Sequence, residues 1–202
     1  MNAQTETTEE QILVAAFNVF VEKGYDNSKM QDIADEAGIK RTVLNYYFRS
    51  KDLLYQKIAK TIVSQVLPKM LSTLNGDLPL EKKIEAYVDN IVDLGIKNPF
   101  LPLFFIKELN ALGASFIEKV LEGKKPNLEP FLKQVKEEIE KGNVVDMDPI
   151  QIFIHIESLC IFPVLVKPMI MLVTNSTEND YKKLMEYRKK EITRFVLKGI
   201  KS

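Results

Sequence analysis

Apolar residues recur at intervals of three and four along most of this chain, which is the spacing of a helix with one buried face. The first such run presents Ile12, Ala16 and Phe20 and then meets Gly24, a residue suited to a left-handed helix cap. Long stretches in which apolar and polar residues alternate, as they do in a strand, are hard to find. The pattern predicts an all-α fold of about nine helices.

Three short helices and a longer fourth are predicted at the start of the chain. Thr8 with Gln11, and Ser28 with Gln31, fit the capping box, in which a hydroxyl and a glutamine satisfy free backbone N–H groups. A further N-cap at Ser50 opens a helix from about residue 51 to residue 74. We therefore predict a small domain at residues 1–50 and a larger helical domain at residues 51–202.

Charge is balanced over the whole chain but not locally. Among 202 residues, 28 Lys and Arg side chains face 28 Asp and Glu, so no overall excess attracts nucleic acid or an anionic membrane. Residues 38–60 hold six basic groups against one acidic group, net +5, whereas residues 1–37 hold two against eight, net −6. Any attraction for an anionic partner must therefore be confined to one segment.

Cysteine content and apolar runs predict a cytoplasmic protein. Cys160 is the single cysteine, so an intramolecular disulfide is impossible, and the N-terminus lacks the basic start and apolar run of a secretory signal. The apolar segment at residues 149–173 is long enough to span a membrane. It nevertheless carries His155, Glu157 and Lys167, which are expensive at membrane depth, so we expect a helix buried in a protein.

The segment after Gly38 predicts a helix-turn-helix. A glycine between two short helices allows a sharp turn, and the helix that follows carries Leu44 and Phe48 on one face. Its opposite face offers side chains that can pair with base edges, such as Arg41 with guanine and Asn45 with adenine. Charged residues on a short helix are, however, usually only its solvated face, so the segment by itself leaves both interpretations open.

The run from Ile12 to Ile58, "ILVAAFNVFVEKGYDNSKMQDIADEAGIKRTVLNYYFRSKDLLYQKI", resembles the N-terminal domain of the TetR family of transcriptional regulators. Its marks include Gly24, Ala37–Gly38 and Tyr47–Phe48, in order and without gaps. The resemblance implies a homodimer whose three N-terminal helices bind double-stranded DNA. It also implies a larger C-terminal domain that binds a small-molecule effector and releases the operator.

By position, the resemblance implies contacts to DNA from the start of the second helix, from the recognition helix and from the start of the fourth helix. The implied DNA-binding residues are Ser28, Lys29, Gln31, Lys40, Arg41, Thr42, Asn45, Tyr46, Tyr47 and Lys51. Two positions depart from the family pattern: Lys40 stands where a capping Ser or Thr is usual, and Asn45 where Tyr is frequent. The operator sequence therefore cannot be transferred.

The larger domain is predicted to hold an apolar ligand pocket and a dimer interface. Candidate pocket residues are Met70, Tyr87, Phe100, Phe104, Phe105 and Phe116, although aromatics at helical spacing more often fill a core. The resemblance implies that the helices near residues 149–166 and 180–197 form a four-helix bundle across the dimer axis. Candidate interface residues are Ile152, His155, Ile156, Leu159 and Phe195.

Two other functions compete with that of a ligand-responsive regulator, most simply a repressor that binds a palindromic operator. An enzyme is disfavoured because one His, one Cys and no phosphate loop leave every catalytic template incomplete, and no cofactor or metal site is expected. A helical dimer that binds a protein and has lost operator binding is the alternative. The basic and polar outer face of the third helix speaks against it.

Overall fold

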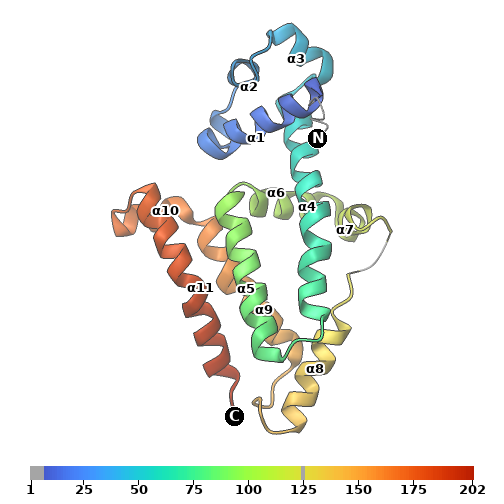
Figure 1. The fold of residues 1–202 in the computed structure, drawn as a ribbon, viewed down its shortest axis with the longest axis vertical. Coiled ribbons are helices and arrows are strands. Elements are labelled where there is room, and N and C mark those ends of the chain that lie inside the picture. Colours follow the sequence, from blue (N-terminus) through green and yellow to red (C-terminus); the bar gives the residue numbers. More distant parts are fainter. Residues whose placement is uncertain (1–6, 124–125) are drawn as a thin grey trace, which may run out of the picture. The chain divides into compact units, whose positions relative to one another are not determined.

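The computed structural model describes residues 7–123 and 126–202, and these residues form helices joined by short turns. Their contacts divide the chain into two compact units, Met1–Gln65 and Val66–Ser202. Figure 1 shows the helices of each unit. They are α1 (Thr8–Asn27), α2 (Met30–Glu36), α3 (Arg41–Tyr47), α4 (Lys51–Asn75), α5 (Leu80–Lys97), α6 (Leu101–Leu112), α7 (Ala114–Val120), α8 (Glu129–Glu140), α9 (Pro149–Leu165), α10 (Lys167–Thr174) and α11 (Glu178–Ile200).

The predicted all-α fold is confirmed. Within residues 7–123 and 126–202, the one β-type pairing is an isolated bridge between Val144 and Lys201. The described residues form eleven helices rather than about nine. Part of the difference lies after Leu165, where α9 ends and Pro168 stands in the first turn of α10. A proline has no N–H to continue a helix, which explains why the helix breaks there.

The apolar segment of α9 and α10 does not form one straight rod. Among the helices described, none is by itself both long and apolar enough to cross a membrane. The pair α9 and α10 has the length and composition together but is bent by 70°. Ile152, Ile156 and Cys160 of α9 are buried within the chain, as expected for a core helix.

The first unit is built around one face of α1. Ile12, Ala16 and Phe20 are fully or almost fully buried, and α1 packs on α2, which packs on α3. Gly24 has φ +75° and a non-helical ψ, so the predicted break at this glycine is confirmed even though the helix assignment continues to Asn27. The inner residue of α3, Leu44, is fully buried, so the short helix is held by its apolar side.

Two predicted capping boxes are wrong in their residues. Helix α1 is capped by Thr7, whose hydroxyl accepts from the Glu10 N–H at 3.3 Å while Glu10 Oε2 accepts from the Thr7 N–H at 2.8 Å. The sequence offers adjacent threonines, and a carboxylate is a stronger acceptor than the amide of Gln11. At α2, Asp32 Oδ2 accepts from the Lys29 N–H at 2.8 Å, one position beyond the predicted pair.

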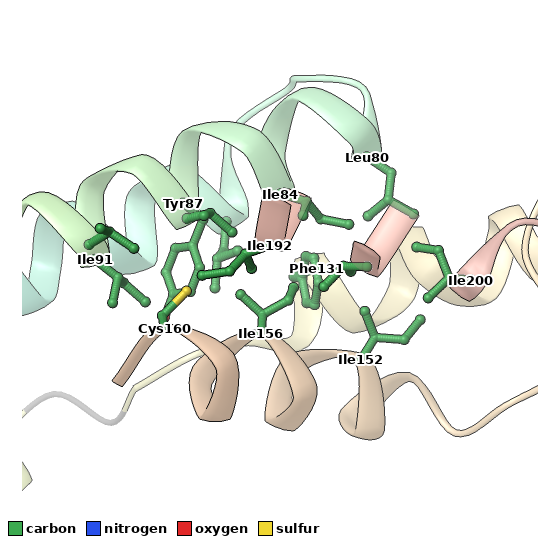
Figure 2. Packing of buried hydrophobic residues seen from close by; sticks show 14 of the residues in the cluster. Leu80, Ile84, Tyr87, Ile91, Phe131, Ile152, Ile156, Cys160, Ile192 and Ile200 are labelled. Carbon is green, nitrogen blue, oxygen red and sulfur yellow. The ribbon is translucent and has the colours of Figure 1, made fainter. Parts of the chain in front are cut away.

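The second unit has its core among α5, α9 and α11, which pack on one another, with α8 against α9. Figure 2 shows this core from close by, with Ile84 and Tyr87 of α5 facing Ile156 and Cys160 of α9. Phe131 of α8 is fully buried in the same cluster. Helices α6 and α7 pack on each other. Burial of apolar area on this scale is the main source of the unit's stability.

Helix α4 belongs to both units. Its first half buries Leu54, Tyr55 and Ile58 in the first unit, and the boundary between the units falls after Gln65. Pro68, inside the helix, lacks the N–H that would bond to the carbonyl of Ser64. The division of functions at residue 50 stays a prediction, and the compact unit that contains α2 and α3 extends further, to residue 65.

Candidate nucleic-acid interface

The helix-turn-helix predicted around Gly38 is confirmed. The Gly38 N–H donates to the Asp35 carbonyl at 3.1 Å, and the φ of +65° at Gly38 turns the chain so that the Ile39 N–H reaches the Ala34 carbonyl at 3.0 Å. These two hydrogen bonds close α2 with a left-handed turn of the kind that glycine adopts without strain. Helix α3 begins two residues later at Arg41.

The outward face of α3 carries the polar residues that the sequence placed there. The side chains of Lys40, Arg41, Thr42, Asn45 and Tyr46 are all exposed, and Tyr46 is 85% exposed. Arg41 Nε donates to Asn45 Oδ1 at 3.3 Å, one helical turn along the same face. Side chains with several hydrogen-bond donors and acceptors are therefore exposed on one face of α3. Their contacts with DNA stay a prediction.

Two features of α3 refine that surface. Lys40 occupies the N-cap position without a side-chain hydrogen bond to the helix, so its ammonium is left to the solvent, as its departure from the family pattern suggested. Tyr47 is 41% exposed, and its ring meets that of Tyr46 edge to face with centroids 5.4 Å apart. The two hydroxyl-bearing rings support each other at the end of α3.

The structure separates the predicted residues at the start of α2. Lys29 and Gln31 are exposed, and Gln31 Nε2 donates to Asp35 Oδ1 at 2.7 Å. Ser28 is 3% exposed, and its hydroxyl donates to the Gly24 carbonyl. The Ser28 side chain thus serves the fold, whereas Lys29 and Gln31 remain accessible to a partner.

The Lys51 side chain also makes hydrogen bonds within the first unit. Its Nζ donates to the Tyr25 carbonyl at 2.6 Å and to the Ser28 carbonyl at 2.9 Å, and it lies 4.2 Å from the centre of the Tyr25 ring. The next residue, Asp52, accepts a hydrogen bond from the Tyr25 hydroxyl at 2.7 Å. The family resemblance implied a contact between Lys51 and the DNA backbone. Sequence reasoning did not anticipate the arrangement seen here, because the partners lie 23 to 26 positions away in the chain.

Five of the six candidate pocket residues fall into two groups. Tyr87 lies in the core shown in Figure 2, and Met70 packs against that core. Phe104 and Phe105 instead meet Phe116, with ring centroids 6.0 and 5.5 Å apart. Phe100, the sixth candidate, is buried at the start of α6. The structure therefore does not bring all six to one place, and their contact with an effector stays a prediction.

A polar pair in the core was missed by the sequence analysis. The hydroxyl of Tyr87 on α5 donates to the Glu157 carboxylate on α9. Burial raises the pKa of Glu157 above the usual glutamate range, and burial together with this carboxylate raises the pKa of Tyr87. Burial and Glu157 also raise the pKa of Cys160 to about 12, so its thiol stays protonated near neutral pH. Helical phase places Tyr87 on the apolar stripe of α5, but nothing in the sequence pairs it with Glu157 of α9.

Candidate interface residues on α9 and α11 differ in exposure. Ile152 and Ile156 lie in the core of the single chain, and Leu159 is half-buried. His155 is exposed, and Phe195 is 69% exposed. The sequence analysis did not single out Phe162 and Tyr187, which are also largely exposed. Because α9 is apolar all round, its sequence did not reveal which of its faces the chain itself covers.

Comparison with known proteins agrees with this geometry. Residues 12–58 match the family model described as "Bacterial regulatory proteins, tetR family". The HTH-type transcriptional activator FasR of Mycolicibacterium smegmatis is 38% identical over 85 residues, which cover 40% of this chain and 39% of FasR. The match thus spans well under half the length of that relative.

Two solved structures are similar over nearly the whole chain. The ketosteroid transcriptional regulator KstR2 of Mycobacterium tuberculosis has a TM-score of 0.67 at 15% identity, with 98% of this chain and 97% of that one covered. The transcriptional regulator FadR of Bacillus subtilis, solved in complex with stearoyl-CoA, has a TM-score of 0.60 at 19% identity, with 95% and 99% covered. At these identities the similarity shows a shared fold.

Proposed function

We propose that this chain, whose residues 12–58 match the TetR family model, binds a two-fold symmetric DNA operator as a homodimer and releases it when a small hydrophobic or amphipathic molecule binds the second unit. The regulatory effect that we propose is repression, because a bound dimer covers DNA that a polymerase needs. The named relative FasR is an activator, so an in vitro transcription assay decides the sign.

The observation that carries the proposal is the outward face of α3. Arg41, Thr42 and Asn45 are exposed on a helix whose opposite side is anchored by the fully buried Leu44. An arginine can donate two hydrogen bonds to guanine, and an asparagine can pair both ways with adenine in the major groove. Lys40 and Lys29 flank this face and supply positive charge for phosphates.

The partner that we propose for α9 and α11 is a second copy of the chain. Ile154 and Phe162 are exposed along α9, and Tyr187 and Phe195 are exposed along α11, which packs on α9. Exposed apolar residues gathered in this way mark interfaces, and two helices from each of two chains make a four-helix bundle. A dimer with two-fold symmetry would present its two α3 helices to half-sites about 34–36 Å apart, or multiples of this distance.

The effector must distinguish two conformers of the protein. A ligand that binds both equally shifts nothing, and a tenfold preference for the non-binding conformer shifts the equilibrium by about 1.4 kcal/mol. The apolar interior of the second unit favours a ligand with an apolar body. Since FadR, which shares the fold, was solved with stearoyl-CoA, a long-chain acyl thioester is the first compound to titrate against the protein–DNA complex.

The test begins with selection of bound duplexes from a random DNA pool by the full chain, followed by titration of the enriched duplex at two salt concentrations. A palindrome bound by a dimer is the expected result. Arg41→Ala should then weaken binding of that duplex about 5- to 150-fold, the equivalent of roughly 1–3 kcal/mol for a bidentate base contact. Sedimentation and circular dichroism should show the dimer and the helix content unchanged.

The matched control is Lys133→Ala, which removes one exposed positive charge from α8 in the second unit. Its affinity for the enriched duplex should equal that of the unaltered chain. An Arg41→Ala variant that binds as tightly as the control would refute the assignment of α3 as the reading helix. Failure of the unaltered chain to enrich any duplex would refute operator binding itself.

A further inference from the structure

The ammonium group of Lys51 has no donor left for a phosphate in this structure. Lys51 is the first residue of α4, and its Nζ lies 2.6 Å from the Tyr25 carbonyl oxygen, 2.9 Å from that of Ser28 and 3.4 Å from that of Asp26. An ammonium has three N–H donors, and three backbone carbonyls surround it here. These carbonyls belong to the turn that follows the break in α1 at Gly24, and that of Tyr25 also accepts from the Ser28 N–H at 3.3 Å.

The Tyr25 side chain holds the same group from another side. Lys51 Nζ lies 4.2 Å from the centre of the Tyr25 ring, within the range of a cation–π contact. The Tyr25 hydroxyl donates to Asp52 Oδ1 at 2.7 Å, so two consecutive residues of α4 grip one tyrosine. The ring also lies 4.6 Å from that of Tyr55, one turn further along α4. Burial and Asp52 raise the pKa of Tyr25 to about 12, which keeps the hydroxyl protonated as a donor.

The gripped turn leads directly into α2. Ser28 ends the turn with its hydroxyl bound to the Gly24 carbonyl, and α2 starts at Met30, which is buried. Helix α2 in turn packs on α3. A shift of the turn relative to α4 would therefore move Lys29 and the helices that carry the proposed DNA contacts.

We propose that Lys51 is a positioning residue for DNA binding: it ties the α1–α2 turn to the first turn of α4 and so fixes where α2 and α3 present their side chains, without contacting a phosphate. The inference rests on the proposed function, because it concerns how the reading helices are held. It replaces the phosphate contact that the family resemblance implied for this lysine. Tyr25 and Asp52 help to hold the α1–α2 turn against α4 in the same way.

The salt dependence of binding separates positioning from phosphate contact. A lysine that neutralises a phosphate releases a counterion. Its loss therefore makes the negative slope of log K against log salt shallower by about 0.9. A positioning residue changes the affinity and leaves that slope unchanged. The measurement uses the full chain and the duplex enriched from the random pool, titrated at four or more salt concentrations.

Lys51→Met should bind the duplex about tenfold more weakly with an unchanged slope, the equivalent of roughly one charge-assisted hydrogen bond. Tyr25→Phe, which alters no charge, should weaken binding in the same direction, again with an unchanged slope. The two effects should be less than additive in the double variant, because both residues hold one turn. Lys51→Arg, which keeps the donors and the charge, should restore part of the affinity.

The matched control is Lys40→Met, which removes an exposed lysine whose side chain does not cap α3. This variant should make the salt slope shallower by about 0.9. A slope that becomes shallower by a similar amount in Lys51→Met would overturn the inference. An affinity equal to that of the unaltered chain would overturn it too. If Lys51→Met does not fold, Tyr25→Phe and Lys51→Arg decide by the same readouts. Failure of the unaltered chain to bind any duplex would instead overturn the proposed function.

Discussion

Gly95 offers the sharpest test of the packing in the second unit. It lies buried on α5, and a Cβ added there would stand 2.6 Å from Val164 Cγ2 and 3.4 Å from Val164 Cγ1 on α9. Real Cβ atoms do not come so close to a carbon, so a helix or a side chain must move. Val164 is buried and branched at Cβ, which leaves it few rotamers with which to yield.

The magnitude follows from two opposing effects of Gly95→Ala. Alanine favours a helix over glycine by about 1 kcal/mol. Overpacking a close contact costs about 1–3 kcal/mol, and the rigid partner places this site near the upper end. The net change is a loss of about 2 kcal/mol, which for a chain of this size lowers the unfolding temperature by roughly 4–8 °C.

Thermal unfolding followed by circular dichroism at one protein concentration measures this loss, since association makes the transition depend on concentration. Gly199→Ala is the matched control, because Gly199 lies in α11 and an added Cβ meets nothing within 4 Å. That variant should be as stable as the unaltered chain or slightly more so. In a Val164→Ala background, Gly95→Ala should become neutral or stabilising. An equal cost of Gly95→Ala in both backgrounds would show that Val164 is not the cause.

Two further outcomes are expected. Gly38→Ala should destabilise the first unit by about 1–2 kcal/mol, because φ +65° is a left-handed conformation that costs other L-residues this much; a urea titration that shows no loss would contradict the turn geometry. Because burial raises the pKa of Glu157 in the folded state, the contribution of its carboxyl to stability is largest below its unfolded pKa of about 4 and is lost as the pH rises through the raised value. The difference in unfolding temperature between the unaltered chain and Glu157→Gln should therefore shrink or reverse from pH 4 to pH 8, and a constant difference would count against it.

Local chemistry was enough to predict most of the helix-turn-helix in the first unit. The breaks at Gly24 and Gly38 follow from the freedom of glycine, and the inward direction of Leu44 follows from helical phase. The capping residue of α1 was missed by one position because the sequence offers two threonines, each followed three residues later by a polar side chain. Which of the two threonines caps the helix depends on which acceptor binds more strongly, and the spacing of residues in the sequence does not show this.

The remaining features could not be predicted from the sequence, because they depend on long side chains or on helices that are apolar on every face. The ammonium of Lys51 reaches carbonyls more than twenty residues away, and only the packed fold brings them within its range. On α9, Ile156 and Phe162 belong to one apolar run, but the chain covers the first and leaves the second largely exposed. Tyr87 and Glu157 are 70 positions apart, so their hydrogen bond follows from the packing of α5 on α9 and from nothing local.

The position of the unit boundary inside α4 constrains how this protein could be recombined with others. A hybrid that kept α1, α2 and α3 and cut the chain after residue 50 would discard Leu54 and Ile58, which are buried in the same unit. The join must instead fall within a helix, near Gln65. Each residue gained or lost there turns everything that follows by about 100° and moves it along the helix axis by about 1.5 Å. Exchange of the second unit is therefore a problem of helical phase, in which splice variants with a whole number of turns between the joined parts should fold and their neighbours should fail.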